Sequence, residues 1–321
     1  MRISERRGGA LLAVLWLSAA LSAIAFTVAN TVRGETERSA TSADSVRAYY
    51  LAVGAVDRAI LYMTWGPGHR NPDGSPRYYA QGMPALRLLF PTGEAVVEII
   101  PETSRMNVNF VRIEDLERLI MAVGADPERA RMIALAIVDW KSPMPPGQPG
   151  PFDGFYESRI PSFRARHASI EEIEEILLIH GMTPELFHGT YVRAADGRLV
   201  FHGGLKHCLS VWGATDRFDA NTAEPALLAA VGMSPEAIAA LLMARNSSPL
   251  GLSPQLLSQI AGPSAGRLGI GGGRTWTFRS TATLRLPDGR LSDVRRSVSS
   301  TIRFEENGYE TLRWYDNAGT R

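Results

Sequence analysis

The sequence predicts an α+β fold in which a long N-terminal helix packs on an antiparallel sheet and an all-α domain is inserted into that sheet. Three observations predict it. An uncharged run from Gly8 to Val32 continues without a proline as far as Met63. Residues typical of strands gather at 85–100 and again at 276–316. Between these stretches, a glycine–proline motif typical of a joint between two helices occurs three times.

Composition indicates a well-packed body and excludes a disordered chain. Of the 321 residues, 45% are hydrophobic and 21% are charged. The 34 Lys and Arg residues nearly balance the 33 Asp and Glu residues, so the charge gives no reason to expect a polyanionic partner. The one cysteine, Cys208, excludes an intramolecular disulfide and is expected to be a small, partly buried apolar side chain.

The N-terminus predicts a membrane-spanning segment. The uncharged run contains 25 residues, and about 20 apolar residues are enough to cross the bilayer core. Arg2, Arg6 and Arg7 precede it, so the N-terminus should stay in the cytoplasm and everything after the run should lie outside. Three fates are open: a signal peptide cut near Ala23 to Ala25, an uncut anchor, or a pilin-type leader cut on the cytoplasmic side before the apolar run.

The residues that follow favour one continuous helix. Apolar side chains recur there at spacings of three and four, as on one face of a helix: Val46, Tyr49, Val53, Val56, Ile60 and Met63. The prediction is a single helix from about Ala10 to Met63, roughly 80 Å long at about 1.5 Å per residue. A removable signal peptide has no need to merge into such a helix, so the continuity favours the pilin-type leader.

Two groups of strands are predicted, one on each side of the helical region. After a loop at 65–76, the early pair is Ala85–Phe90 and Glu94–Ile100. The late group is Trp276–Leu286, Ser292–Phe304 and Tyr309–Asp316, with the hairpin-turn sequences Asp288-Gly289 and Asn307-Gly308 between its members. We expect the late group to form an antiparallel meander, which the early pair joins and whose apolar face packs on the long helix.

The region from about Thr103 to Leu257 has helical patterning and contains an internal repeat. Its three copies lie at 122–130, 179–187 and 230–238. In each copy a glycine should end one helix in the left-handed conformation, a polar residue should cap the next helix, and a proline suits that helix's first position. The residues are Gly124, Asp126 and Pro127; Gly181, Thr183 and Pro184; and Gly232, Ser234 and Pro235.

The match extends upstream in two copies. Arg105–Asn109 precedes the first joint and Arg217–Asn221 precedes the third, and the first copy has four more residues before its glycine, about one helical turn. The pattern therefore predicts helix-hairpin-helix, SAM-like modules inserted into a split sheet.

The start of the chain resembles the leader of pilin-like proteins. The residues that carry the resemblance are RRGGALLAVLW at 6–16. It implies cleavage by prepilin peptidase after Gly8, or after Gly9, and methylation of the new N-terminus. Most pilins carry a glutamate at mature position five, where this chain has Ala13. The family of general secretion pathway protein K, a minor pseudopilin of the type II secretion system, resembles pilins and lacks that glutamate.

The rest of the chain is similar to the same family. Four stretches resemble its recurring phrases, at 98–110, 136–140, 169–186 and 219–232. The resemblance implies a structural subunit rather than an enzyme, placed at the pseudopilus tip, where it helps to initiate or cap the filament for protein export. It implies pseudopilins I and J and other pseudopilus subunits as partners, and prepilin peptidase as a transient partner. It also implies a single pass through the inner membrane, a cytoplasmic N-terminus and a periplasmic body.

The expected domain boundaries follow from this layout. Residues 1–8 form the leader, and residues 9–64 form the long helix, which spans the membrane at about 9–32. Residues 65–102 form the first part of the pilin-like sheet, 103–260 the inserted helical domain, and 261–321 the strands that complete the sheet.

A membrane-anchored DNA-binding or DNA-uptake protein is the alternative, because helix-hairpin-helix modules often bind DNA. Such hairpins hold a phosphate with free backbone N–H groups. Here proline removes one donor at each of the three joints, and Asp126 adds a negative charge to one of them. We therefore expect no nucleic-acid partner. An anchored enzyme is a second alternative, although the chain has no H-E-x-x-H motif and no P-loop.

The resemblance also implies a calcium site near an acidic loop that follows Asp139-Trp140. Calcium takes about six to eight oxygen ligands, whereas residues 141–158 contain only two carboxylates, Asp153 and Glu157. Asp139, Asp153 and Glu157 are the candidate ligands, with capping and surface solvation as their alternative role, and no cofactor is required.

Two further segments, one with histidines and a cysteine and one rich in glycine, are expected to have structural roles only. His202, His207 and Cys208 lack a fourth ligand at metal-site spacing. The glycine-rich segment 269–273 lacks the setting of a nucleotide site and is expected to be a flexible return to the sheet.

Overall fold

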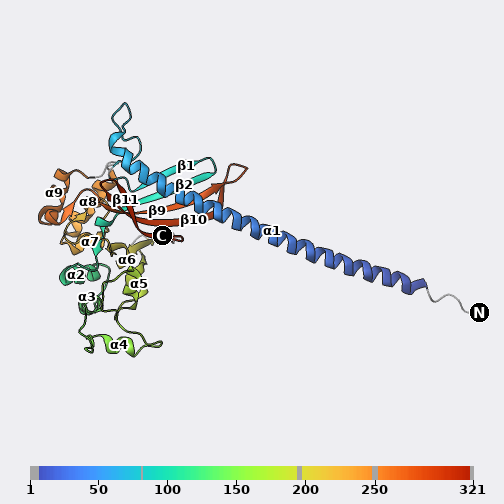
Figure 1. Ribbon diagram of the computed structural model, residues 1–321, viewed down its shortest axis with the longest axis horizontal. Coiled ribbons are helices and arrows are strands. Elements are labelled where there is room, and N and C mark those ends of the chain that lie inside the picture. Colours follow the sequence, from blue (N-terminus) through green and yellow to red (C-terminus); the bar gives the residue numbers. More distant parts are fainter. Residues whose placement is uncertain (1–6, 81, 194–196, 248–251, 319–321) are drawn as a thin grey trace, which may run out of the picture.

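The computed structural model describes residues 7–80, 82–193, 197–247 and 252–318. It contains a long projecting helix, a five-stranded sheet on which the C-terminal part of that helix lies, and an insertion beside the sheet (Figure 1). These parts confirm the predicted α+β class.

Helix α1, Arg7–Trp65, is one uninterrupted helix of 59 residues, about 90 Å long at about 1.5 Å per residue. The predicted continuity between the apolar run and the amphipathic segment is confirmed. Residues 1–6 of the expected leader lie outside the described residues. A short 3₁₀ turn, η1 (Gly66–Gly68), follows the helix and leads to the sheet.

The sheet has the order β1-β2-β9-β10-β11, and every neighbouring pair is antiparallel. Its strands are β1 (Ala85–Phe90), β2 (Gly93–Pro101), β9 (Thr275–Arg285), β10 (Leu291–Glu305) and β11 (Gly308–Tyr315). The early pair joins the late meander through β2 and β9, where Val97 lies opposite Ser280. The chain therefore leaves the sheet after β2 and returns to it at β9, with the whole insertion between.

The C-terminal part of α1 packs on this sheet through a row of small side chains. Ala48, Ala52, Ala55 and Ala59 are fully buried, at spacings of four and three. Most of the predicted stripe faces the same core: Val56 and Ile60 are buried, Tyr49, Val53 and Met63 are partly buried, and Val46 is 53% exposed. Alanine side chains end at Cβ and let a helix approach the sheet closely. The alanines therefore widen the predicted face, and Val56 and Ile60 are buried beside them.

The insertion has a hydrophobic core of its own, separate from the core between α1 and the sheet. Its helices are α2 (Ile113–Ala122), α3 (Pro127–Lys141), α4 (Asp153–Glu157), α5 (Pro184–His188), α6 (Leu205–Cys208), α7 (Pro225–Ala230), α8 (Pro235–Ser247) and α9 (Pro254–Ala261). Three 3₁₀ helices accompany them: η2 (Glu102–Ser104), η3 (Ile173–Leu178) and η4 (Gly262–Arg267).

The expectation of an all-α insertion is wrong, because the insertion also contains strands. A two-stranded hairpin, β4 (Gly189–Arg193) with β5 (Leu199–Gly203), extends from it. Short parallel pairs also join β3 (Met106–Asn107) to β6 (Leu209–Ser210), and β7 (Phe218–Asp219) to β8 (Leu268–Gly269). Because β8 pairs inside the insertion, the insertion extends past residue 260 to the start of β9.

The glycine-rich return is packed. Gly271 donates its backbone N–H to Asp219 Oδ1 over 3.1 Å. A Cβ at Gly272 would overlap the ring of Trp276, so this position has room only for glycine.

Candidate functional site

No other part of the described chain covers the N-terminal part of α1. Every residue from 9 to 33 is exposed, including large apolar side chains such as Trp16 and Phe26. Gly9 and Ala13, two positions singled out in the sequence, lie on this part, and Gly8 lies in the first turn of α1. Within the described residues, α1 is the one helix long and apolar enough to cross a membrane. An apolar helical surface of this length needs a bilayer or neighbouring helices to cover it.

The three predicted joints in the insertion have the geometry of helix ends. Gly124, Gly181 and Gly232 adopt positive φ angles of 112°, 82° and 97°. The residues two positions later accept hydrogen bonds from backbone N–H groups in the first turn of the next helix. These bonds are Arg129 N–H to Asp126 Oδ1 (3.0 Å), Leu186 N–H to Thr183 Oγ1 (3.5 Å) and Ala237 N–H to Ser234 Oγ (3.2 Å).

Proline opens each of the helices that follow. Pro127, Pro184 and Pro235 are the first residues of α3, α5 and α8. Proline thus removes the N–H donor of the first residue of each helix, and the cap accepts from the N–H of the third, so two of the donors that would face a phosphate are lost. The joints fix the direction of the chain and offer no cradle for an anion.

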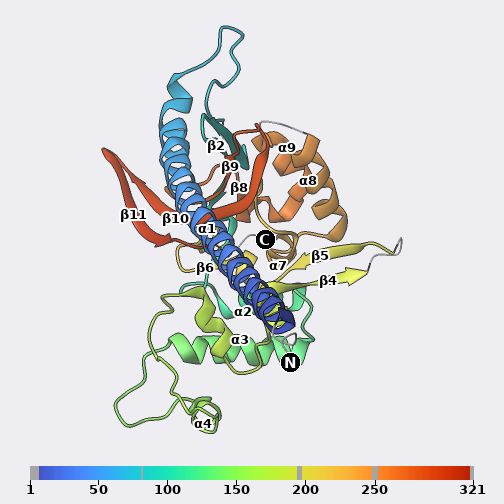
Figure 2. The ribbon, with the colours of Figure 1, turned by 90° about the vertical axis from the view of Figure 1, so that its right-hand side faces the viewer.

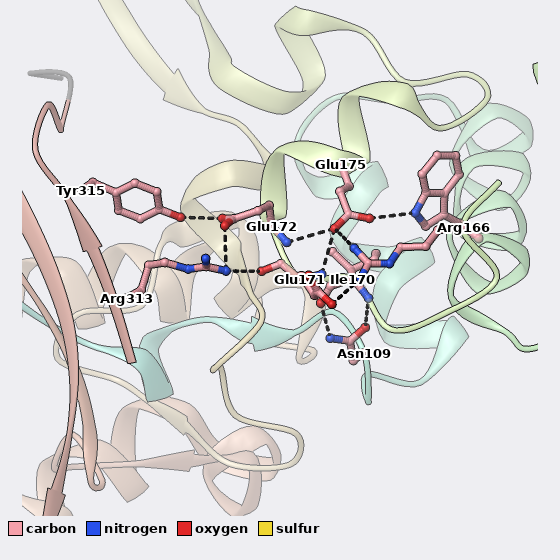
Figure 3. Close-up of polar contacts among 9 residues, drawn as sticks. Asn109, Arg166, Ile170, Glu171, Glu172, Glu175, Arg313 and Tyr315 are labelled. Atoms are coloured by element: carbon pink, nitrogen blue, oxygen red, sulfur yellow. Dashed lines mark hydrogen bonds and ion pairs between the residues drawn. The ribbon is translucent and has the colours of Figure 1, made fainter. Parts of the chain in front are cut away.

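A polar network ties the insertion to the edge strand of the sheet (Figure 3). On β11, Arg313 forms an ion pair with Glu172 over 2.7 Å and donates to the Glu171 carbonyl over 3.2 Å. Tyr315 Oη donates to Glu172 Oε2 over 2.5 Å. Burial and the hydrogen bond to Glu172 both raise the pKa of Tyr315, so its hydroxyl keeps its proton.

The same network continues into the insertion through Glu175. Its carboxylate accepts from the backbone N–H groups of Glu171 and Glu172, from Arg166, and from Trp140 Nε1 on α3 over 3.2 Å. Burial alone would raise the pKa of Glu175, but these donors outweigh it and hold the pKa below its usual value. A continuous chain of contacts therefore runs from β11 to α3.

Glu102 forms a second attachment at the point where the chain leaves the sheet. It is almost fully buried. Its carboxylate accepts from Thr277 Oγ1 on β9 over 2.6 Å and from the hydroxyl of Ser210 on β6. Arg105 lies 3.5 Å away and balances its charge. Together with the β11 network, Glu102 fixes the insertion to the sheet at two places.

Two of the three calcium candidates come together, and the third does not. Asp139 on α3 and Asp153 on α4 lie beside His167, and one ligand atom from each falls within 4.8 Å of the others. Glu157 instead pairs with Arg164 over 3.4 Å, with both side chains exposed. His167 is not among the predicted ligands. No spacing in the sequence connects it to the two aspartates, because the loop returns to them only in the folded chain.

The soft-metal candidates stay apart from any metal cluster among the described residues. Cys208 is fully buried in the insertion's core, where burial raises the pKa of its thiol to about 12. It is a small apolar side chain there, more deeply buried than the sequence analysis expects.

One serine motif that the sequence analysis misses also has a structural explanation. Gly262–Gly266 reads GPSAG and so fits the spacing of a nucleophile elbow. That elbow requires a strand followed by a helix, whereas this segment is the 3₁₀ turn η4 after helix α9, and Ser264 is buried in it. It lacks the setting of a hydrolase nucleophile.

Comparison with known proteins agrees with this architecture. Residues 102–190, from η2 into β4, match the family model for type II secretion system protein K. This matched segment makes up the first half of the insertion. The whole fold is similar to a chain in the crystal structure of the GspK–GspI–GspJ complex from the enterotoxigenic Escherichia coli type 2 secretion system.

That structural similarity covers 90% of this chain and 99% of the other chain, with a TM-score of 0.52 and 16% sequence identity. At this identity the match shows the fold alone, and the shared fold includes the long helix and the sheet as well as the insertion. No curated protein sequence matches the chain.

Proposed function

We propose that this chain is a minor pseudopilin that forms the tip of a type II secretion pseudopilus together with pseudopilins I and J. The division of α1 carries the proposal. Its N-terminal part is exposed all round at residues 9–33, while Ala48 to Ala59 bury one face on the sheet. One rigid rod thus joins an uncovered apolar segment to a folded body, as a subunit held first by a membrane and then by a helical bundle requires.

The body supports a position at the end of a filament. Viewed almost along α1, the insertion spreads well beyond the helix and the sheet (Figure 2). The attachments at Glu102 and Glu172 hold it at the side of the sheet. A subunit this wide is difficult to repeat along a helical stack, because each copy would collide with the next. Ala13 agrees with this position, since it has no carboxylate to pair with the N-terminal ammonium of a neighbour.

Membrane topology and processing belong to the same proposal. Arg2, Arg6 and Arg7 favour a cytoplasmic N-terminus, an inner-membrane span and a periplasmic body. Prepilin peptidase would cut after Gly8 or Gly9 and leave α1 as the start of the mature chain. The match of residues 102–190 to the protein K family model supports a structural role rather than an enzymatic one.

N-terminal sequencing of protein extracted from membranes tests the processing step. A mature chain that starts at Gly9 or Ala10 supports the proposal. A start near Phe26 would indicate simple secretion, and a start at Met1 would indicate a static anchor; either result contradicts it.

Site-specific crosslinking tests the assembly. The one natural cysteine, Cys208, is buried, so an introduced cysteine reacts alone. Thr41→Cys places a thiol on the exposed part of α1, and Ser162→Cys places a matched control on the exposed loop of the insertion. We expect crosslinks to pseudopilins I and J from Thr41→Cys and not from Ser162→Cys. Equal crosslinking from both, or none from either, would contradict the proposal, and a salt-dependent affinity for duplex DNA would favour the DNA-binding alternative.

A further inference from the structure

Asp139, Asp153 and His167 form a compact cluster where α3, α4 and the following loop meet. Asp139 is near the end of α3, Asp153 begins α4, and His167 follows in the next loop. Figure 1 shows α4 at the outer end of the insertion. The cluster adjoins the network that reaches β11, because Trp140 and Arg166, the chain neighbours of Asp139 and His167, both donate to Glu175.

The carboxylate of Asp139 is buried, and no hydrogen bond of normal geometry from the described residues reaches it. The residue is 5% exposed, and within the described residues neither Oδ1 nor Oδ2 accepts a hydrogen bond. Buried carboxylates in proteins are normally hydrogen-bonded, paired with a cation or bound to a metal. Burial raises the pKa of Asp139, against the opposing influence of the His167 imidazole and the Phe152 backbone N–H. Both of its oxygens are available to a ligand in the cluster.

The two ring nitrogens of His167 have the kind of contacts that orient a metal-binding histidine. Its Nδ1 lies 3.1 Å from the backbone carbonyl oxygen of Asp139, and its Nε2 lies 2.9 Å from Asp153 Oδ1. A histidine ligand usually donates the N–H of one ring nitrogen to a carbonyl or carboxylate, which turns the other nitrogen toward the metal. Here the bond from Nδ1 to the carbonyl turns Nε2 toward the carboxylates.

Gly150 leaves a space between these groups. A Cβ at this position would lie 2.6 Å from both Asp139 Oδ1 and His167 Cε1. The backbone N–H of Gly150 donates to Asp153 Oδ2 over 2.7 Å and so orients the second carboxylate. The absence of a side chain at residue 150 therefore keeps the space beside Asp139 open.

These donors do not fit the calcium site that the family resemblance implies. Calcium takes about six to eight oxygen ligands, whereas this cluster offers two carboxylates and an imidazole nitrogen. Glu157, the remaining carboxylate of the loop, is paired with Arg164 elsewhere. Two carboxylates and one imidazole match the ligand types of zinc and similar ions, which need only about four ligands and complete them with water.

We propose that Asp139, Asp153 and His167 bind a divalent transition-metal ion of the zinc type, and not calcium. The ion joins the end of α3 to the start of α4 and to the loop at His167. It closes the segment 140–166 on itself, and this pinning holds the outer end of the insertion in one conformation. The proposal rests on the cluster alone and does not depend on the assembly role.

The test uses the full chain without an affinity tag, purified in detergent and freed of metal with a chelator. Thermal unfolding is then followed with zinc, cobalt or calcium chloride added, and affinities are measured by titration calorimetry. We expect zinc to raise the unfolding temperature and calcium at the same concentration to leave it unchanged. Cobalt should give the visible absorption bands of a bound ion. Calcium stabilisation equal to that of zinc, or no stabilisation by any of these ions, would overturn the proposal.

Four variants locate the site. Asp139→Asn and His167→Gln should each weaken zinc binding by at least ~100-fold, since loss of a ligand exceeds the 10–100-fold effect of an outer partner. Gly150→Ala should also block binding, because its methyl group fills the space. Glu157→Gln is the matched control and should bind like the natural chain.

Asp139→Asn distinguishes a loss of zinc binding from a failure to fold. Without metal it should be at least as stable as the natural chain, because it removes a buried carboxylate whose desolvation outweighs the favourable influence of His167 and the Phe152 N–H. Zinc binding that persists in both Asp139→Asn and His167→Gln would show that the ion binds elsewhere.

Discussion

The first and third helix hairpins of the insertion share a sequence pattern but differ in how deeply they are buried. In both, a short strand of a parallel pair precedes the hairpin, β3 in one and β7 in the other. In both, an asparagine accepts from a distant backbone N–H over 2.8 Å: Asn109 from Ile170 and Asn221 from Leu252. Helix α2 has 10 residues and α7 has 6, which accounts for the four extra residues of the first copy.

The helices after the two joints have different environments. Helix α3 buries seven of its residues, including Ile133, Ile137 and Trp140, whereas Leu241 is the one buried residue of α8. The joint glycine, cap and proline are alike in both. The motif therefore sets where one helix ends and the next begins, while the apolar content of the second helix decides whether it lies inside or at the surface.

The helices before the joints differ in charge. Nine residues ahead of the joint glycine, the first copy has Asp115 and the third has Ala223. Asp115 is fully buried and pairs with Arg267, Arg112 and Arg118. The bond to Arg267, which follows α9, holds the two ends of the insertion together.

Matched truncations in α3 and α8 should give the largest difference in the free energy of unfolding between the two copies. Ile137→Ala removes a fully buried side chain and should cost about 2–5 kcal/mol through lost burial and a cavity. Met243→Ala on α8 removes a side chain that is 74% exposed and should change stability by less than about 0.5 kcal/mol. Denaturant titration of each full-length variant in detergent measures both. Similar losses in the two variants would show that α8 is covered in the protein in solution.

A smaller effect is expected from Asp115→Asn, which should cost about 2–3 kcal/mol at neutral pH. The value lies below that of a fully enclosed pair because the arginines reach solvent. Burial alone would raise the pKa of Asp115, but the hydrogen bonds and charges of Arg267 and Arg112 outweigh it and lower the pKa. The control is Glu114→Gln, which changes an exposed carboxylate on the same helix.

This lowered pKa sets the pH dependence. The stabilisation is complete above the pKa of an unfolded aspartate, about 3.9, and is lost as pH falls below it toward the lower folded pKa. Unfolding titrations at several pH values should therefore show a constant gap between the natural chain and Asp115→Asn above about pH 5 and a shrinking gap below about pH 4. A gap that grows in acid would show that the carboxylate is already protonated in the folded chain.

Local patterns predict most of the fold in this molecule. The uncharged run predicts the start of α1, and the sequences around Asp288-Gly289 and Asn307-Gly308 predict the meander, because such signals act within a few residues. The β4–β5 hairpin was also open to prediction, since Asp196-Gly197 is a turn sequence between segments rich in β-branched and aromatic residues. The helical patterning on both sides of it concealed the signal.

Contacts that form only in the folded chain are harder to predict from the sequence. The predicted stripe of α1 includes the buried Val56 and Ile60, but it leaves out the row of buried alanines, whose hydrophobic signal is weak, and includes the exposed Val46. His167 meets Asp139 and Asp153 only because a loop returns on itself, and no local rule encodes that return. The network from Arg313 to Glu175 likewise joins residues more than 130 positions apart.

The smallest contrast is between the glycines of the first two joints. Both Gly124 and Gly181 have positive φ angles, so alanine should cost about 1–2 kcal/mol at either position through backbone strain. At Gly124 a new Cβ would have nothing within 4 Å, whereas at Gly181 it would clash with the end of Met132 and lie 3.0 Å from Ile133 Cγ1.

Gly181→Ala should therefore be less stable than Gly124→Ala by about 1 kcal/mol or more, since overpacking typically costs 1–3 kcal/mol and Met132 is flexible enough to relieve part of it. Shortening that side chain with Met132→Ala should remove most of the difference, which denaturant titration of the two glycine variants and their double mutants measures. If the two glycine variants are equally stable with Met132 in place, backbone strain alone sets the cost at both joints. The close contact between the first and second copies would then contribute nothing to that cost.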